Sequence, residues 1–267
     1  MQWFLNFQPS STINITDRGL AYGDGLFETI SASDGTIPNL HLHLTRLTRG
    51  LKRFGFKYED RAIDELVIFL KEKAAELGDV GFKVIVTRGS GGRGYLPPEK
   101  TEFSWLVGVF ELPDYNVAQQ HGVKLTALSV QSSVNRSTAG LKHLNRLENV
   151  LAKQALKAPY FEAVLSDAFG SMVECIQSNV FWVKNGALYT PVLNVSGVQG
   201  TMRHRVIKAF PGVVNIVQQP SSKLLEADEI FVTNALSGVL PVIEYNGRQL
   251  SIGPVCRNLM EQLANIP

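Results

Sequence analysis

The sequence predicts an α+β fold divided between two domains, and three observations lead to this prediction. β-rich runs and helical stretches are mixed along the chain without the regular strand–helix alternation of a doubly wound parallel sheet. The 267 residues, 45% hydrophobic and 19% charged, can bury one large core or two smaller ones. A polar segment without periodicity begins near residue 113. We therefore expect a smaller N-terminal domain at 1–112, a linker at 113–120 and a larger C-terminal domain at 121–267.

The first domain opens with a predicted strand and continues with two helices. Residues 25–33 alternate apolar and polar side chains, as a half-buried strand requires. Residues 42–56 and 60–77 carry apolar side chains at helical spacing, and the second stretch follows an acidic cap. Residues 82–88 and 103–112 are β-rich and stand on either side of a glycine loop, which predicts a hairpin-like pair of strands.

The second domain continues the mixture of strands and helices. Its predicted strands lie within residues 123–130, 162–167, 172–191 and 228–247. The pair Asn185-Gly186 marks a hairpin turn inside the third of these tracts. Helices are predicted after Gly140, where Leu144, Leu147 and Leu151 recur at helical spacing, within 197–210, and over 254–265.

Composition and charge exclude several classes of partner. Lys and Arg total 26 against 24 Asp and Glu, a net charge of +2, which offers no strong field for nucleic acid or an anionic membrane. Cys175 and Cys256 are too few for a disulfide framework and are typical of a reducing compartment. The N-terminal stretch lacks the features of a signal peptide, and no run of apolar residues is long enough for a membrane span. We therefore expect a cytoplasmic protein.

The glycine-rich segment 89–94, Gly-Ser-Gly-Gly-Arg-Gly, resembles a dinucleotide-binding loop but does not satisfy its requirements. It follows a predicted strand, yet Pro97 and Pro98 come directly afterwards and cannot open the helix that the motif needs. The segment remains a flexible loop that carries Arg93. This arginine either grips a carboxylate through a bidentate pair or is a solvated surface charge.

Metal and serine-nucleophile chemistry also lack support in the sequence. His41 and His43 stand two residues apart, but no further His or Cys completes a ligand set for a metal ion. No Gly-x-Ser-x-Gly segment provides a nucleophile elbow. We expect no metal.

Several segments together suggest a phosphorylated aldehyde cofactor. Lys142 supplies an amine just before a predicted helix, and Glu174 lies on a predicted strand. Near Thr201 and Met202, the start of another helix presents free N–H groups suited to phosphate. Arg46 adds a fork-shaped donor, and residues 232–238 place small and amide side chains at a strand end. Pyridoxal phosphate requires an amine, a phosphate cup and an acid beside its ring nitrogen.

Four longer segments carry a family resemblance. The stretches "DRGLAYGDGLFET", "GLKHLNRLENVLA", "VECIQSNVFW" and "GTMRHRVI" resemble the fold-type IV pyridoxal-phosphate enzymes, the group of branched-chain and D-amino acid aminotransferases. The resemblance runs essentially from end to end and implies a two-domain, D-amino acid aminotransferase-like α+β fold. Within the family, "RGSGGRGY" and "KHLNRLE" favour the lyases that act on 4-amino-4-deoxychorismate.

The resemblance also implies roles for individual residues. Lys142 would be the catalytic lysine that forms the Schiff base, and Glu174 would pair with the pyridine nitrogen. The implied phosphate ligands are Arg46 and the backbone N–H groups of Thr201, Met202, Asn234 and Ala235. The implied substrate contacts are Arg93, Tyr95 and Glu28. Met202 stands where the aminotransferases usually carry threonine, and Asn234 with Ala235 replaces a hydroxyl-bearing pair.

The implied reaction is the conversion of 4-amino-4-deoxychorismate to 4-aminobenzoate and pyruvate. An amino acid aminotransferase with the same lysine and cofactor is the alternative enzyme. A cofactor-binding scaffold without activity is a third hypothesis, but such a scaffold would need neither Lys142 nor Glu174. The family further implies a homodimer.

Overall fold

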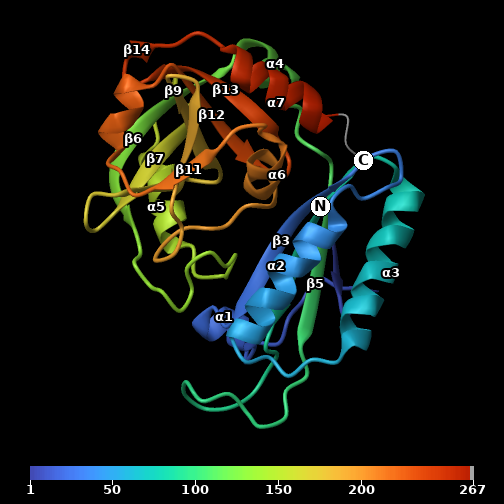
Figure 1. Cartoon of the computed structure of the whole chain (residues 1–267). Helices are drawn as coiled ribbons and strands as arrows, with labels where there is room; N and C mark the ends of the chain where they lie inside the picture. The colour runs from blue at the N-terminus through green and yellow to red at the C-terminus, as the bar shows by residue number, and fades with distance from the viewer. Residues whose placement is uncertain (265–267) are drawn as a thin grey trace. The chain divides into compact units, whose positions relative to one another are not determined.

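The computed structural model describes residues 1–264, which form two compact units (Figure 1). Unit 1 consists of Met1–Pro113 together with Leu141–Asn145. Unit 2 consists of Asp114–Gly140 and Arg146–Pro267, of which the structure describes the part up to Ala264. Within residues 1–264, no helix has the length and apolar character needed to cross a membrane.

Unit 1 is built on a five-stranded antiparallel sheet with the strand order β2-β1-β5-β4-β3. Two long helices, α2 and α3, lie against this sheet (Figure 1). Its elements are, in chain order, β1 (Gln2–Leu5), β2 (Gln8–Pro9), α1 (Arg18–Tyr22), β3 (Gly25–Ala32), α2 (Leu40–Arg53), α3 (Asp60–Leu77), β4 (Val80–Thr87) and β5 (Ser104–Phe110).

The alternation of side chains along β3 decides which face of this sheet is buried. Leu26 and Ile30 point to the covered face, where Leu47 of α2 and Leu70 of α3 pack in one hydrophobic core. Phe27 points to the opposite face, which is only half-buried.

The predictions of strands at 25–33, 82–88 and 103–112, with the last two paired, are confirmed. The helix predicted at 60–77 is confirmed as α3.

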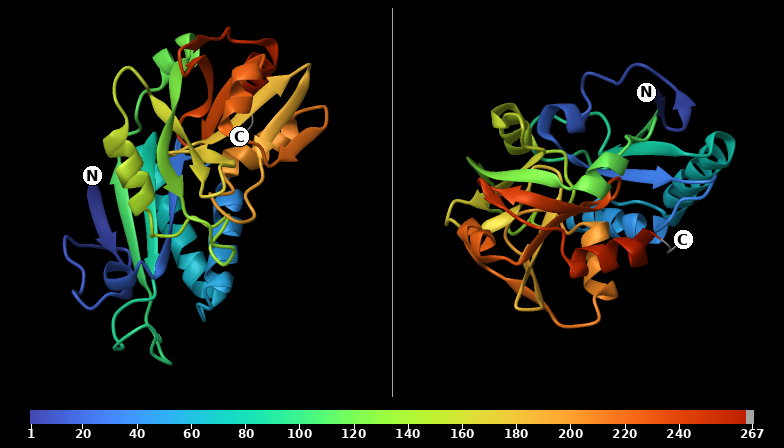
Figure 2. Two further views of the ribbon diagram at one scale, coloured as in Figure 1. Left: turned by 90° about the vertical axis from the view of Figure 1, so that its left-hand side faces the viewer. Right: turned by 90° about the horizontal axis from the view of Figure 1, so that it is seen from above.

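Unit 2 contains a nine-stranded mixed sheet that is curled (Figure 2). Its strand order is β11-β10-β9-β12-β13-β6-β7-β8, with β14 paired to β13. Its elements are α4 (Asn116–His121), β6 (Val123–Ser132), α5 (Leu147–Ala155), β7 (Glu162–Asp167), β8 (Met172–Cys175), β9 (Asn179–Lys184), β10 (Ala187–Pro191), α6 (Thr201–Ala209), β11 (Val214–Val217), the 3₁₀ helix η1 (Ser221–Glu226), β12 (Glu229–Asn234), β13 (Gly238–Tyr245), β14 (Arg248–Gln249) and α7 (Pro254–Ala264).

The central strands of unit 2 are buried on both faces. Val180 and Trp182 of β9 belong to one hydrophobic core, whereas Phe181 of the same strand belongs to a second core with Val206 of α6 and Leu259 of α7. This explains why the tract 172–191 is apolar almost throughout. The turn predicted at 185–186 joins β9 to β10, with Asn185 at φ 50°. Asn265, the last residue of the predicted C-terminal helix, lies outside the described residues.

The two units differ from the predicted domains in two places. Residues 114–120 of the proposed linker are part of unit 2, where residues 116–121 form α4 and Gln119 donates a hydrogen bond from its side chain to the Ser237 carbonyl at 3.1 Å. Lys142 was expected in the C-terminal domain. The segment that carries it belongs instead to unit 1, since its backbone bonds to β3.

Candidate active site

Lys142 lies in an extended segment beside β3, which is the edge strand of its sheet. The Phe27 N–H donates to the Lys142 carbonyl at 2.8 Å, and the Leu144 N–H donates to the Gly25 carbonyl at 3.1 Å. These bonds fix the backbone on both sides of the lysine. The Lys142 ammonium nitrogen lies 4.3 Å from the centre of the Phe27 ring, a distance typical of a cation–π contact.

The helix expected to follow Lys142 begins later than its leucines indicate. It starts at Leu147, because Leu144 is engaged in the backbone pairing with β3. Leu147 is 70% exposed, and Val150 and Leu151 are also exposed. The apolar face predicted for this helix therefore exists, but it does not pack against the core of this chain.

Arg46 is held by a buried carboxylate, Glu28, which is only 1% exposed. Arg46 donates to it from Nε at 2.8 Å and from Nη2 at 2.5 Å, and Nδ1 of His43 lies 2.7 Å from the same carboxylate. Burial opposes the charge on Glu28, but the Arg46 guanidinium and the bond to His43 outweigh it and lower the Glu28 pKa to about 2. Glu28 is thus an ionised internal partner of Arg46.

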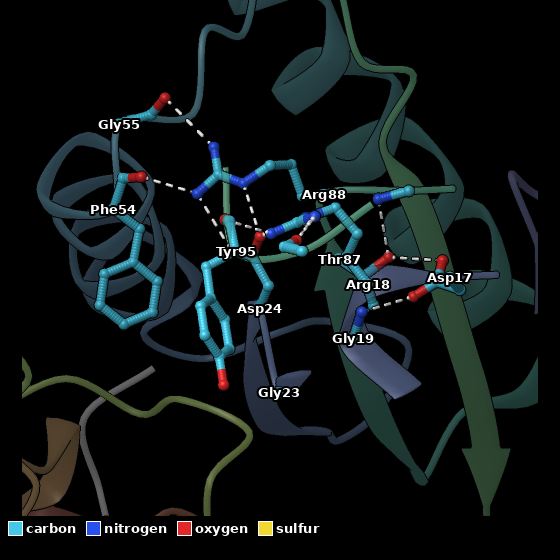
Figure 3. A network of polar contacts seen from close by, with 12 residues as sticks. Asp17, Arg18, Gly19, Gly23, Asp24, Phe54, Gly55, Thr87, Arg88 and Tyr95 are labelled. Atoms are coloured by element: carbon cyan, nitrogen blue, oxygen red, sulfur yellow. Dashed lines mark hydrogen bonds and ion pairs between the residues drawn. The ribbon is translucent and has the colours of Figure 1, made fainter. Parts of the chain in front are cut away.

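The glycine-rich loop of residues 89–94 is held at its far end by the buried Arg18, which shares Asp24 with a second buried arginine, Arg88 (Figure 3). Arg18 donates to the carbonyls of Gly94 and Tyr95 at 3.1 and 2.7 Å, and its Nε donates to Asp24 at 3.0 Å. Arg88 donates to the two oxygens of Asp24 at 2.8 and 3.0 Å. Burial raises the Asp24 pKa, but the two arginines outweigh it and hold this pKa below its usual value.

The side chains predicted to contact substrate on this loop are exposed in the isolated chain. Tyr95 is 88% exposed, although its ring meets that of Tyr22 with centroids 5.6 Å apart. Arg93 is also exposed. Sequence reasoning assigned no role to Arg18, which bonds to the loop, or to Asp24 and Arg88, which form ion pairs beside it. All three lie inside the quoted stretches "DRGLAYGDGLFET" and "RGSGGRGY".

In unit 2, Glu174 stands on β8 with a well-defined set of donors. Its side chain accepts from the Val198 N–H at 2.9 Å and from the Asn179 amide at 3.2 Å. The oxygen of that amide accepts from the Gly200 N–H at 3.1 Å, so Asn179 links Glu174 to the start of α6. A Cβ at Gly200 would lie 2.1 Å from the side-chain oxygen of Asn179, so a larger residue here would have to displace that amide.

The N-terminus of α6 offers backbone donors at the predicted positions. Thr201 and Met202 open the helix, where the first N–H groups have no partner within the helix itself. The Met202 side chain packs against the hydrophobic core around Val206. Methionine at this position therefore contributes packing, and any anion contact from it is restricted to its N–H group.

The second predicted anion-binding segment is a tight turn built by Asn234. The oxygen of its side chain accepts from the N–H groups of Leu236 and Ser237 at 2.9 and 2.8 Å. The hydroxyls of Thr233 and Ser237 are buried and, among the residues that the structure describes, have no hydrogen-bond partner. Buried hydroxyls without partners are uncommon and suit a polar ligand at this turn.

Each unit, taken by itself, carries groups that suit pyridoxal phosphate. Unit 1 provides the primary amine of Lys142 on a fixed backbone and the guanidinium of Arg46. Unit 2 provides the Glu174 carboxylate and the N–H donors at the start of α6. Among residues 1–264, no three His, Cys, Asp or Glu side chains are grouped so that they would hold a metal ion.

Comparison with known proteins agrees with this chemistry. The family model for class IV amino-transferases matches residues 25–245. The chain is 31% identical to the aminodeoxychorismate lyase of Vibrio harveyi, over 98% of this chain and 99% of that protein. It is 33% identical to a putative branched-chain-amino-acid aminotransferase of Methanocaldococcus jannaschii, over 97% and 92% of the two chains.

The solved structures include a close match in fold. The crystal structure of 4-amino-4-deoxychorismate lyase from Pseudomonas aeruginosa superposes with a TM-score of 0.92 at 35% identity, covering 98% of each chain. The family model covers most of the chain, including Glu28, Arg46, Lys142 and Glu174. This protein therefore belongs to the class IV aminotransferase family.

Proposed function

We propose that the protein is a pyridoxal-phosphate-dependent lyase that converts 4-amino-4-deoxychorismate to 4-aminobenzoate and pyruvate, a step of folate biosynthesis. The observation that carries the proposal is the agreement over the full chain with the Pseudomonas aeruginosa lyase, at 35% identity and a TM-score of 0.92. The aminodeoxychorismate lyase of Vibrio harveyi is a second relative of this kind, at 31% identity.

In this proposal Lys142 holds the cofactor covalently and later moves a proton. Bound pyridoxal phosphate supplies an electron sink for the carbon next to the substrate amine. The Lys142 amine removes the proton from that carbon, and Glu174 keeps the ring nitrogen protonated because a carboxylate favours a neighbouring positive charge. The fixed backbone of Lys142 and the donors around Glu174 support these roles. Pyruvate is the leaving group, and formation of the aromatic ring favours its loss.

The cofactor phosphate is proposed to bind Arg46 and the backbone N–H groups of Thr201, Met202, Asn234 and Ala235. Glu28 is better suited to orient Arg46 than to contact substrate, because it is buried and already accepts from Arg46 and His43. The exposed side chains of Arg93 and Tyr95 remain available for a substrate carboxylate. Arg18 supports this role by anchoring the carbonyls of the loop.

We further propose that the protein acts in the cytoplasm as a homodimer. Helix α5 supports a contact between subunits because it exposes three apolar side chains on one face, Leu147, Val150 and Leu151. An exposed apolar face of this kind usually packs against another protein surface. The two cysteines are both free and buried, which agrees with a reducing compartment.

The alternative function is amino acid aminotransfer, which the 33% identity to the archaeal protein favours. Product analysis separates the two. The loaded enzyme should release pyruvate and 4-aminobenzoate from aminodeoxychorismate, and Lys142→Ala should lower the rate by roughly a thousandfold. Lys71→Ala, an exposed lysine of α3, is the matched control and should have no effect. Faster amino transfer from an amino acid to 2-oxoglutarate than pyruvate release would contradict the proposal and favour the aminotransferase.

A further inference from the structure

Two lysines share one aromatic ring on the half-buried face of the unit 1 sheet. The Lys83 ammonium nitrogen lies 3.6 Å from the centre of the Phe27 ring, and that of Lys142 lies 4.3 Å from the same point. The two nitrogens are therefore no farther apart than the sum of these distances, about 8 Å. Lys83 accordingly belongs to the immediate surroundings of the proposed catalytic amine.

The strand register explains why the two lysines meet at this ring. Lys83 of β4 stands opposite Thr29 of β3, and antiparallel neighbours of this kind share one face of the sheet. Phe27 lies two residues from Thr29, so it points to the same face. Lys142 reaches this face from the segment that is hydrogen-bonded to the outer edge of β3. Both lysines and Phe27 are half-buried.

On the other side of Lys83, an aromatic ring covers the neighbouring strand. The neighbour of Lys83 on β5 is Gly108, which has no side chain. The Trp3 ring occupies that place, since a Cβ on Gly108 would lie 3.0 Å from it. Lys83 thus lies on a sheet face that carries two aromatic rings. Apolar surroundings of this kind strengthen the interaction of a cation with any anion that joins it.

We propose that Lys83 binds a carboxylate of the substrate and so determines specificity for a dicarboxylate. The Lys83 ammonium group lies within about 8 Å of the Lys142 nitrogen, where the substrate reacts in the proposed function, and its half-buried surroundings strengthen its attraction to a carboxylate. The inference rests on the proposed function for the identity of the substrate, which carries two carboxylates. Arg93 would bind one of these carboxylates and Lys83 the other. Lys83 is not required for holding the cofactor.

The test replaces Lys83 by Met, which keeps length and contact with the ring but removes the charge, and by Arg, which keeps the charge. Lys73→Met is the matched control, because Lys73 lies over the Phe4 ring elsewhere in unit 1, with its nitrogen 5.5 Å from the ring centre. Each cofactor-loaded variant is assayed for kcat and KM with aminodeoxychorismate. Calorimetry measures its dissociation constant for chorismate, which carries the same two carboxylates with a hydroxyl in place of the amine.

Lys83→Met should raise KM and weaken chorismate binding at least tenfold, while kcat, cofactor absorbance and melting temperature change little. Lys83→Arg should recover most of the affinity, and Lys73→Met should match the wild type. If Lys83→Met lowers the melting temperature, Lys83→Gln provides a second neutral variant. Unchanged KM and chorismate affinity in the neutral variants would overturn the inference, as would failure of Lys83→Arg to recover either. If the wild type releases no pyruvate, the proposed function fails, and chorismate binding alone decides the role of Lys83.

Discussion

A buried carboxylic acid in unit 2 should make the stability of the protein fall as pH rises. Glu162, the first residue of β7, is fully buried. Burial raises its pKa from 4.5 to about 8, and the charge of Glu174 adds to this effect, whereas the bond from the Gln177 N–H, the Lys153 charge and Ser178 oppose it. The native protein therefore keeps the Glu162 proton at neutral pH.

The size of the effect follows from proton linkage. In the unfolded chain Glu162 loses its proton near pH 4.5, while in the native state it loses it near 8. Between these values the native state binds more protons, so the free energy of unfolding falls by about 1.4 kcal/mol per pH unit. This contribution is fully present below pH 4.5 and is lost as pH rises towards 8. Between pH 5 and 8 the loss amounts to about 3 kcal/mol.

Glu162→Gln should remove this loss, because an amide does not titrate in this pH range and its oxygen can still accept from the Gln177 N–H. Urea unfolding followed by circular dichroism at pH 5, 6, 7 and 8 measures the difference in unfolding free energy between variant and wild type. That difference should grow by about 3 kcal/mol in favour of the variant between pH 5 and 8. Glu72→Gln, at an exposed position of α3, should show no such trend. A pH-independent difference for Glu162→Gln would refute the assignment of a protonated acid.

Two further predictions concern turnover and assembly. Glu174→Gln should lower kcat on the order of a hundredfold with little change in KM, the pattern of a lost transition-state interaction. In the same pyruvate assay Arg93→Ala should chiefly raise KM, so equal effects of both changes on KM would contradict the separate roles. The wild type should sediment as a dimer at micromolar concentration, and Leu147→Lys with Leu151→Lys should shift it towards monomer. A fully active wild-type monomer would rule out the homodimer.

Most secondary structure could be predicted from the sequence because it depends on local pattern. The alternation in residues 25–32 and the Asn185-Gly186 pair each determine a strand or turn without help from distant residues. The helix at 60–77 was predicted with its correct bounds, since Asp60 and Gly78 mark its two ends.

The segment around Lys142 could not be predicted in this way. Its leucine spacing indicates a helix, but hydrogen bonds to Gly25 and Phe27, more than a hundred residues earlier, hold it extended. The helix α4 is a similar case: its polar sequence carries no periodic signal, and packing against β13 with the Gln119 bond stabilises it. In both segments tertiary contacts outweigh local preference.

The supporting residues of the candidate site were missed for the same reason. Glu28 was expected beside substrate because it lies in a motif, whereas the pleat of β3 points it to the covered face and towards Arg46. Arg18 donates hydrogen bonds to two backbone carbonyls that lie 76 and 77 residues further along the chain. No local sequence pattern predicts such a contact. Side chains that act on the cofactor have a chemical signature in the sequence, but those that orient them do not.

The choice between lyase and aminotransferase should therefore depend on residues that meet the rest of the substrate. With the proposed roles, both reactions begin with removal of a proton by Lys142 and need Glu174 beside the ring nitrogen, so these two residues favour neither. A branched-chain amino acid carries one carboxylate and an apolar side chain, which would lie unfavourably beside the second ammonium group of Lys83. Aminodeoxychorismate brings a second carboxylate that this ammonium group can pair with. With the role proposed for it, Lys83 thus favours the lyase on electrostatic grounds, independently of sequence similarity.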